Sequence, residues 1–167
     1  MAPGLKRLSI VDDLFIARRD RFFRIAELWM RNGFHRRLGL KGFVRSSIFD
    51  EEIAVAMKAM GFARFRFGAE TWSDRLLKEI GKGCTSDDHQ RVVDIGQKLG
   101  VRVTASFIHG LPGETEEDRA ITADYLKRSR GRIGVSGSYD YRSFPGTAFY
   151  DGASPLETDM RVRESGK

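Results

Sequence analysis

Five short apolar runs of this sequence each end in side chains that can carry charge or form strong hydrogen bonds. A carboxylate binds hydroxyl and ammonium groups, a guanidinium binds carboxylates and phosphates, and an imidazole exchanges a proton near neutral pH. In chain order these residues are Asp12 and Asp13, Arg45, Glu70, His109 with Gly110, and Tyr141. If the runs are parallel strands, these residues meet at one edge of a sheet, where ligands of such proteins bind. Strand ends are polar in any case because loops contact water, so ordinary loops also fit the pattern.

The loop His109–Thr115 is the most informative short segment. Gly110 allows close backbone approach, Pro112-Gly113 favours a tight turn, and Thr115 with Asp118 fits a capping box. Exposed amides in such a loop can bind an anion or a nucleotide. The segment lacks the Gly-Lys-Ser/Thr of a P-loop and the G-x-G-x-x-G spacing. Turn-and-cap structure and ligand contact both remain open.

Cysteine and histidine content limits the metal chemistry. The single cysteine, Cys84, excludes an intramolecular disulfide, a cysteine-ligated zinc site and an iron–sulfur cluster held by this chain alone. The three histidines, His35, His89 and His109, lack ligand spacing with Cys84. We therefore predict no metal ligands, and Cys84 is expected to be an ordinary thiol.

Apolar runs with a strand-like pattern alternate with segments of helical period. The predicted strands are residues 8–11, 38–44, 62–67, 101–108 and 133–141. The predicted helices are residues 13–31, 50–61, 73–80, 85–100 and 115–128, with Asp50, Ser73, Thr85 or Ser86, and Thr115 as candidate N-caps. Helical connections between apolar strands indicate a parallel sheet with right-handed crossovers. A complete eight-fold barrel needs roughly 250 residues, so the sequence predicts an α/β fold, either a partial (β/α) barrel of about five strands and four to five helices or a doubly wound sheet.

The chain is expected to form one domain over residues 1–150, followed by a polar tail over residues 151–167 that is flexible or begins a further element. Its 167 residues are 41% hydrophobic and 31% charged, an ordinary globular balance that excludes collagen-like and wholly disordered chains. No secretory signal and no apolar stretch of membrane-spanning length is visible. These features predict a soluble, cytoplasmic protein with no membrane partner.

The net charge of +6 is concentrated in the first 48 residues, which hold eleven basic and four acidic side chains. One interpretation is a nucleic-acid-binding module. The other is the solvated face of a helix whose opposite face carries Phe15, Phe22, Ala26 and Trp29. The residues that would contact nucleic acid are Arg18, Arg19, Arg21, Arg24, Arg36 and Arg37, with Trp29 and Phe34.

Seven short segments stand in order between about Ser9 and Tyr150. They are Val11-Asp-Asp-Leu-Phe15, Gly42-Phe-Val-Arg45, Met57 to Gly61, Phe67-Gly-Ala-Glu-Thr71, Leu77 to Thr85, Phe107 to Thr115 and Pro145-Gly-Thr147. This ordered set resembles the later part of a radical S-adenosylmethionine (SAM) domain. The likeness is greatest to the branch that often follows a cobalamin-binding domain, similar to the anaerobic magnesium-protoporphyrin cyclase group and the methylthiotransferases. Each segment is weak alone, whereas their order is specific.

The resemblance implies a partial (β/α)₆ barrel, with SAM and a [4Fe–4S] cluster as cofactors and cobalamin in some full-length relatives. In that family Cys-x-x-x-Cys-x-x-Cys follows the first strand and holds the cluster, and a Gly-Gly-Glu-like segment ends the second. Neither motif is present, so residues 8–11 correspond to the family's third strand. The resemblance thus implies a partial domain, inactive alone, whose partner is the missing barrel half or another chain. The alternatives are a small nucleotide- or anion-binding α/β module and the nucleic-acid-binding domain. Neither the substrate nor the oligomeric state follows from the sequence.

The resemblance also assigns roles to the strand-end residues. Arg45 and Glu70 correspond to contacts with the ribose or methionyl group of SAM, although the two side chains could instead pair with each other. The strand end with Ile108, His109 and Gly110 corresponds to the segment along the adenine. Asp12, Asp13 and Tyr141 would face the substrate.

Overall fold

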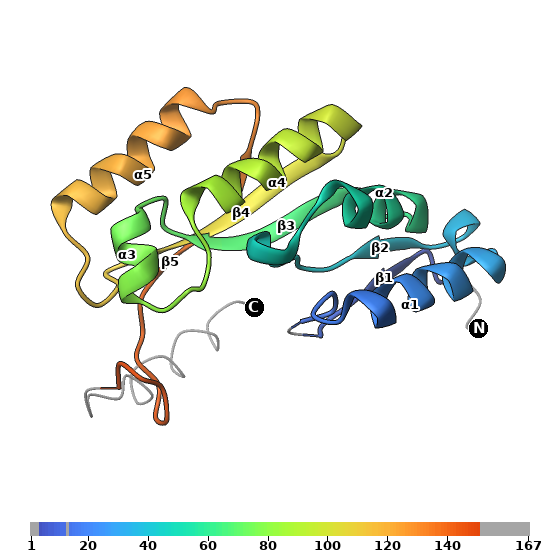
Figure 1. The fold of residues 1–167 in the computed structure, drawn as a ribbon, viewed down its shortest axis with the longest axis horizontal. Coiled ribbons are helices and arrows are strands. Elements are labelled where there is room, and N and C mark those ends of the chain that lie inside the picture. Colours follow the sequence, from blue (N-terminus) through green and yellow to red (C-terminus); the bar gives the residue numbers. More distant parts are fainter. Residues whose placement is uncertain (1–3, 13, 151–167) are drawn as a thin grey trace, which may run out of the picture.

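Five parallel strands follow one another in chain order in the computed structural model, which describes residues 4–12 and 14–150 (Figure 1). The strands are β1 (Arg7–Ser9), β2 (Gly39–Lys41), β3 (Arg64–Glu70), β4 (Arg102–His109) and β5 (Gly134–Asp140). β1 pairs with β2, and β4 pairs with both β3 and β5, all in parallel. A parallel bridge between Leu40 and Phe62 and a hydrogen bond from the Val44 amide to the Arg66 carbonyl (2.7 Å) connect the two ladders. The predicted parallel α/β fold, a partial barrel, is confirmed.

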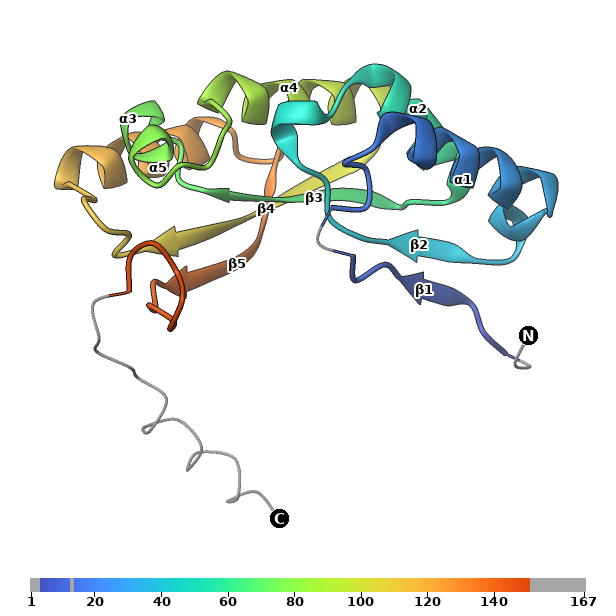
Figure 2. The same ribbon diagram turned by 60° about the horizontal axis from the view of Figure 1, so that its bottom comes forward.

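All five helices lie on one side of the strands, and β1 and β5 lie at opposite ends of the row (Figure 2). The helices are α1 (Arg19–Arg31), α2 (Glu51–Met60), α3 (Asp74–Glu79), α4 (Ser86–Leu99) and α5 (Glu116–Arg128), with 3₁₀ turns η1 (Phe34–Arg36) and η2 (Ser46–Ile48). Among the described residues, no helix covers the opposite face of the strands. We call this second face the open face. It carries Arg64, Arg66 and Gly68 of β3, with Arg102 and Ser106 of β4.

The predicted N-caps are confirmed. The Asp50 side chain accepts a hydrogen bond from the Ile53 amide (2.9 Å), and the Ser73 hydroxyl accepts one from the Leu76 amide (3.3 Å). Thr85 and Thr115 each form a capping box with the aspartate three residues later. A side-chain oxygen at these positions satisfies an amide that has no partner within the helix, so these helix starts follow from local chemistry.

The first helix is shorter than predicted. It begins at Arg19, because the Asp12 carboxylate accepts a hydrogen bond from the Leu14 amide (2.9 Å) and the chain turns before entering the helix. Phe15 lies in this turn, yet it is buried and packs edge-to-face on Phe22 with the ring centroids 5.7 Å apart. The apolar pattern therefore located the buried face correctly but not the helix start.

The bounds of all five strands differ from the prediction by one to three residues, most of all in β2 and β3. β2 has three residues instead of the predicted seven, because its pairing with the next strand is reduced to the Leu40–Phe62 bridge and the Val44 hydrogen bond. β3 continues beyond the predicted end at Phe67 to Glu70, since Gly68 and Glu70 still pair with β4. Glu70 is therefore the last residue of β3 and is still paired with β4.

The hydrophobic core fills the layer between the sheet and the helices. Phe65 and Phe67 of β3 and Phe107 of β4 are fully or almost fully buried there, and Phe49 packs edge-to-face on Phe65. Burial of each such ring stabilises the fold by roughly 1.5–3 kcal/mol. Because successive side chains of a strand point to opposite faces, this burial fixes Arg66 on the open face.

The predicted tail over residues 151–167 lies outside the described residues. Within the part of the chain that is described, none of the helices has both the length and the apolar character needed to cross a bilayer.

Candidate functional site

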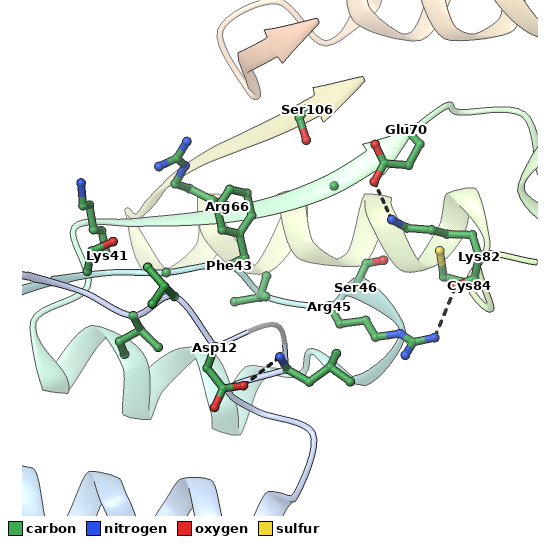
Figure 3. Close-up of a pocket in the computed structure, with 17 residues that line it drawn as sticks. Asp12, Lys41, Phe43, Arg45, Ser46, Arg66, Glu70, Lys82, Cys84 and Ser106 are labelled. Carbon is green, nitrogen blue, oxygen red and sulfur yellow. Dashed lines mark hydrogen bonds and ion pairs between the residues drawn. The ribbon is translucent and has the colours of Figure 1, made fainter. Parts of the chain in front are cut away.

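A cavity of about 620 Å³ lies on the open face at the carboxyl ends of β1, β2 and β3 (Figure 3). Its size is in the range typical of small-molecule sites. The labelled polar side chains around it come from the segment after β1, from β2 and the segment after it, from β3 and β4, and from the loop between α3 and α4. They are Asp12, Lys41, Arg45, Ser46, Arg66, Glu70, Lys82, Cys84 and Ser106.

Glu70 enters this cavity through an unusual backbone conformation. It is the only non-glycine residue with positive φ among residues 4–12 and 14–150, with φ of 64°. A bulge between Gly68 and Glu70 accompanies this conformation. The Glu70 carboxylate folds back over Gly68, where an added Cβ would collide with it, and accepts a hydrogen bond from the Lys82 ammonium (2.6 Å). A non-glycine residue held in this region is a recognised feature of functional sites.

Polar contacts behind Glu70 hold its backbone in place. The Thr71 hydroxyl lies 3.1 Å from the Thr122 hydroxyl, which also accepts a hydrogen bond from the Trp72 amide (2.9 Å). The Ser73 hydroxyl donates to the buried Asp118 carboxylate (2.5 Å). These bonds join the end of β3 to α5, so a strained residue is supported by a packed polar network.

Asp118 is the charged centre of that network. The Arg75 guanidinium, and after it the hydroxyls of Ser73 and Thr115, hold the pKa of the Asp118 carboxyl well below its usual range. The burial of Asp118 opposes this shift. A buried carboxylate that is fully bonded in this way is ionised in the folded protein and anchors two loops at the same edge of the sheet.

Arg45 lies at the same end of the cavity as Glu70 but does not pair with it. The Arg45 guanidinium donates to the Lys82 backbone carbonyl (3.3 Å), and the Glu70 carboxylate pairs with the Lys82 side chain instead. Gly83, with φ of 68°, permits this approach, because an added Cβ would lie 3.0 Å from the guanidinium. The expected alternative of an Arg45–Glu70 ion pair is therefore wrong: Lys82 separates the two side chains.

Cys84 contacts the buried His89 beside the cavity. The Cys84 sulfur is 4.0 Å from His89 Nε2, and His89 Nδ1 is 2.9 Å from the Ser46 hydroxyl. Burial lowers the pKa of His89 to about 4 and raises the pKa of the Cys84 thiol. A neutral imidazole beside a protonated thiol fits the prediction of an ordinary cysteine, since thiolates form where a cation lowers the thiol pKa.

The structure divides the predicted site residues between two cavities. Asp12, Arg45 and Glu70 line the large one. Ile108 and His109 line a second cavity of about 260 Å³ beside α5, which Glu70 also lines. Gly110 and Tyr141 line neither, and Asp13 lies outside the described residues. Only part of the predicted set is thus gathered in one place.

Two regions that were open to a binding role have their polar groups engaged internally. In the loop before α5, the Gly110 amide donates to the Glu114 carboxylate (2.6 Å) and the Thr115 amide donates to Asp118 (2.8 Å). This favours the turn-and-cap interpretation. On and near α1, four arginines pair with carboxylates, which favours a solvated helix face. The pairs are Arg18–Asp20, Arg19–Asp50 and Arg19–Glu52, Arg21–Asp12, and Arg24–Glu27.

Sequence reasoning missed Lys41, Arg66, Lys82 and Ser106 as cavity residues. Arg66 and Ser106 occupy alternate positions of predicted strands, opposite buried aromatic or apolar neighbours, so strand period alone could have placed them on the open face. Lys82 is flanked by two glycines with positive φ. That pattern marks a tight loop, but it does not reveal that the loop lies against Glu70.

A row of parallel strands in chain order, helices on one side and a cavity at the strand ends together define a partial (β/α) barrel with a ligand-binding edge. The sequence matches the Radical SAM superfamily model over residues 4–126. This match covers most of the chain, which therefore belongs to the radical SAM superfamily, as the resemblance implied.

Relatives from archaea match over a limited part of their own length. The chain is 32% identical over 125 residues to an uncharacterized methyltransferase, PH0819, of Pyrococcus horikoshii, covering 75% of this chain and 27% of the relative. It is 32% identical over 108 residues to a putative methylthiotransferase, MJ0865, of Methanocaldococcus jannaschii, covering 65% and 24%. The chain thus spans about a quarter of the length of these relatives.

Among solved structures, the fold is similar to that of TsrM from Kitasatospora setae, a radical SAM methyltransferase with cobalamin and a [4Fe–4S] cluster bound. The TM-score is 0.73 at 23% identity, covering 84% of this chain and 27% of that chain. At this identity the similarity concerns the fold.

Proposed function

We propose that this chain supplies the SAM-binding edge of a radical SAM enzyme of the methyltransferase or methylthiotransferase kind. The single observation that carries the proposal is the convergence of Arg45, Glu70 and Lys82 at one end of a ligand-sized cavity. These residues belong to the segments on which the family resemblance rests. The relatives described as methyltransferases and methylthiotransferases support the reaction class.

The chemistry of this end of the cavity suits the polar part of SAM. The guanidinium of Arg45 has a single hydrogen bond among the described residues, at 3.3 Å, so its other N–H groups can bind the SAM carboxylate. The Glu70 carboxylate can accept hydrogen bonds from the SAM ribose hydroxyls or its ammonium group. Asp12, on the segment after β1, is assigned to the substrate side.

The residues of this chain do not fit the [4Fe–4S] cluster of the family. The cluster motif supplies three thiolates, whereas this sequence contains one cysteine, and no group of three possible metal ligands occurs among the described residues. We therefore place the cluster on polypeptide outside these 167 residues. SAM is expected to bind the isolated chain weakly, because part of its binding energy would come from the iron.

The test is a titration of the ¹⁵N-labelled 167-residue chain with SAM, followed by the amide resonances. We expect weak binding that shifts the amides of Arg45, Gly68, Glu70 and Gly83. Arg45→Gln should reduce the affinity about tenfold, the effect of losing a charge-assisted hydrogen bond. Arg24→Gln, which removes an exposed arginine of α1 paired with Glu27, serves as the matched control and should leave the affinity unchanged.

Two results would contradict this proposal. One is the absence of shifts at the cavity, or equal binding by Arg45→Gln and the unmodified chain. The other is tight, iron-independent binding of SAM and adenosine, which would favour a small nucleotide-binding module. Anaerobic reconstitution is a separate test: a stable [4Fe–4S] cluster on this chain would overturn the placement of the cluster.

A further inference from the structure

The cavity carries more positive than negative charge. Its lining contains four basic side chains, Lys41, Arg45, Arg66 and Lys82, and two acidic ones, Asp12 and Glu70. Both carboxylates are already engaged, Glu70 with Lys82 (2.6 Å) and Asp12 with Arg21 (3.4 Å) outside the lining. An uncompensated positive charge in a concave, partly apolar site attracts anions.

Among these cations, Arg66 has a buried donor atom that no hydrogen bond satisfies within the described part of the chain. Its guanidinium lies over the ring of Phe43, 4.8 Å from the centroid, and its buried Nε atom has no hydrogen-bond partner among the described residues. A buried N–H donor without a partner costs free energy that a bound acceptor would recover. Other arginines of this chain, such as Arg19 and Arg75, form ion pairs with carboxylates. Arg66 differs from them in this respect.

Lys41 lies beside Arg66 on the same side of the sheet, at the end of the cavity away from Arg45 and Lys82 (Figure 3). The Ser106 hydroxyl of β4 lies between the two ends. The positive charge continues behind this pair: Arg64 is two residues before Arg66 on the open face and is in register with Arg102 of β4. Neither Lys41 nor any of these three arginines has an acidic partner among the residues the structure describes.

We propose that Lys41 and Arg66 form an oxyanion-binding subsite, and that it binds a carboxylate or phosphate group of a small-molecule substrate. The assignment to a substrate rests on the proposed function, in which SAM occupies the opposite end of the cavity. A small molecule is favoured because the cations line a recess and the Nε atom of Arg66 is buried, whereas a nucleic-acid backbone binds cations that project from a surface.

The subsite is tested by calorimetric titration of the 167-residue chain with inorganic pyrophosphate and with citrate, at low and moderate ionic strength. Arg66→Gln and Lys41→Gln should each weaken binding about tenfold, the effect of one charge-assisted hydrogen bond. Arg66→Lys, which keeps the charge but lacks the Nε donor and the planar fork, should show an intermediate loss. Arg24→Gln is the matched control with the same change in net charge and should bind like the unmodified chain.

The two probes distinguish the sources of the oxyanion. Tighter binding of pyrophosphate supports a phosphorylated substrate, and tighter binding of citrate supports a polycarboxylate. The subsite is overturned if neither probe binds, if Arg24→Gln weakens binding as much as Arg66→Gln, or if only Arg45→Gln weakens it. A single-stranded RNA oligonucleotide that binds equally to Arg66→Gln and the unmodified chain, and displaces pyrophosphate, would also overturn it.

Failure of the subsite and failure of the proposed function give different results. Pyrophosphate binding that depends on Arg66, with no amide shifts on addition of SAM, keeps the anion subsite and overturns SAM binding. Shifts at Arg45 and Gly83 with SAM, without any effect of pyrophosphate or citrate, keep the proposed function and overturn the subsite. Folding of each variant is checked by urea denaturation.

Discussion

The two faces of the sheet differ in whether the basic side chains on them have acidic partners. On the helix side, the strands bury phenylalanines and small apolar residues, and most of the arginines on the helices pair with aspartate or glutamate. On the open face, Arg64 and Arg66 of β3 and Arg102 of β4 have no acidic partner among the described residues. Charges that serve only solubility or stability can be neutralised within the chain. Cations left unneutralised beside a cavity therefore indicate a ligand or a further piece of protein.

The largest expected contrast lies between two adjacent residues of β3. Phe67→Ala should destabilise the chain by about 4 kcal/mol, because it empties a fully buried position between sheet and helices. Arg66→Gln, one residue earlier on the open face, should change stability by less than about 0.5 kcal/mol. Urea denaturation of both variants measures this difference. Comparable losses would show that the open face is a second core, and the comparison of the two faces would fail.

The next effect is the pH dependence that arises from the buried His89. The pKa of His89 is about 4 in the folded chain, below the ordinary 6.5. Between these two pH values the imidazole of the unfolded chain binds a proton, whereas that of the folded chain stays neutral. Stability from this residue is present above pH 6.5 and is lost as the pH falls toward 4, by up to about 3 kcal/mol. His89→Gln should be less stable at pH 7 but show a flatter dependence between pH 6.5 and 4.

Urea denaturation at several pH values gives these slopes. His109→Gln, at an exposed histidine outside the core, is measured in parallel as the control variant. An identical slope for His89→Gln and the unmodified chain would show that this histidine is not the source of the pH dependence.

A smaller effect is expected for the ionised carboxylate among the helices. Asp118→Asn should cost about 2 kcal/mol, because it weakens the bonds from Arg75, Ser73 and Thr115 to a buried acceptor. Asp124→Asn, at an exposed pair with Arg128 on the same helix, should cost less than about 0.5 kcal/mol. Thermal denaturation of the two variants checks this prediction. Equal losses would mean that burial does not set the strength of ion pairs on the helix side.

Local signals of the sequence determined much of the fold. Asp50, Ser73, Thr85 and Thr115 marked four helix starts correctly, because N-capping needs only a side-chain oxygen and the amides that follow it. The predicted start of α1 was wrong. The apolar helical pattern extends back to Phe15, but the turn in which Asp12 accepts a hydrogen bond from Leu14 precedes the helix. Strand ends were the weakest point, as pairing with a distant neighbour decides whether Val44 or Gly68 belongs to a strand.

The sequence indicated some residues of the candidate site but not others. Asp12, Arg45 and Glu70 line one cavity, because parallel strands bring their carboxyl ends to one edge. Lys82 was missed because its role depends on a loop that packs against a residue twelve positions earlier. Ile108 and His109 line a second cavity because α5 packs beside them. No local pattern of the sequence encodes where that helix packs.

By itself the sequence determined the succession of strands and helices, the family and the absence of the three thiols that the family's cluster motif supplies, since period, capping residues and counts are local properties. Only the tertiary structure decided that Lys82 separates Arg45 from Glu70, that Glu70 adopts a strained conformation over Gly68, and that the buried Nε atom of Arg66 has no hydrogen-bond partner among the described residues. These facts depend on how the strands, the loops at their ends and the helices pack together, and that packing is not fixed by any local pattern of the sequence.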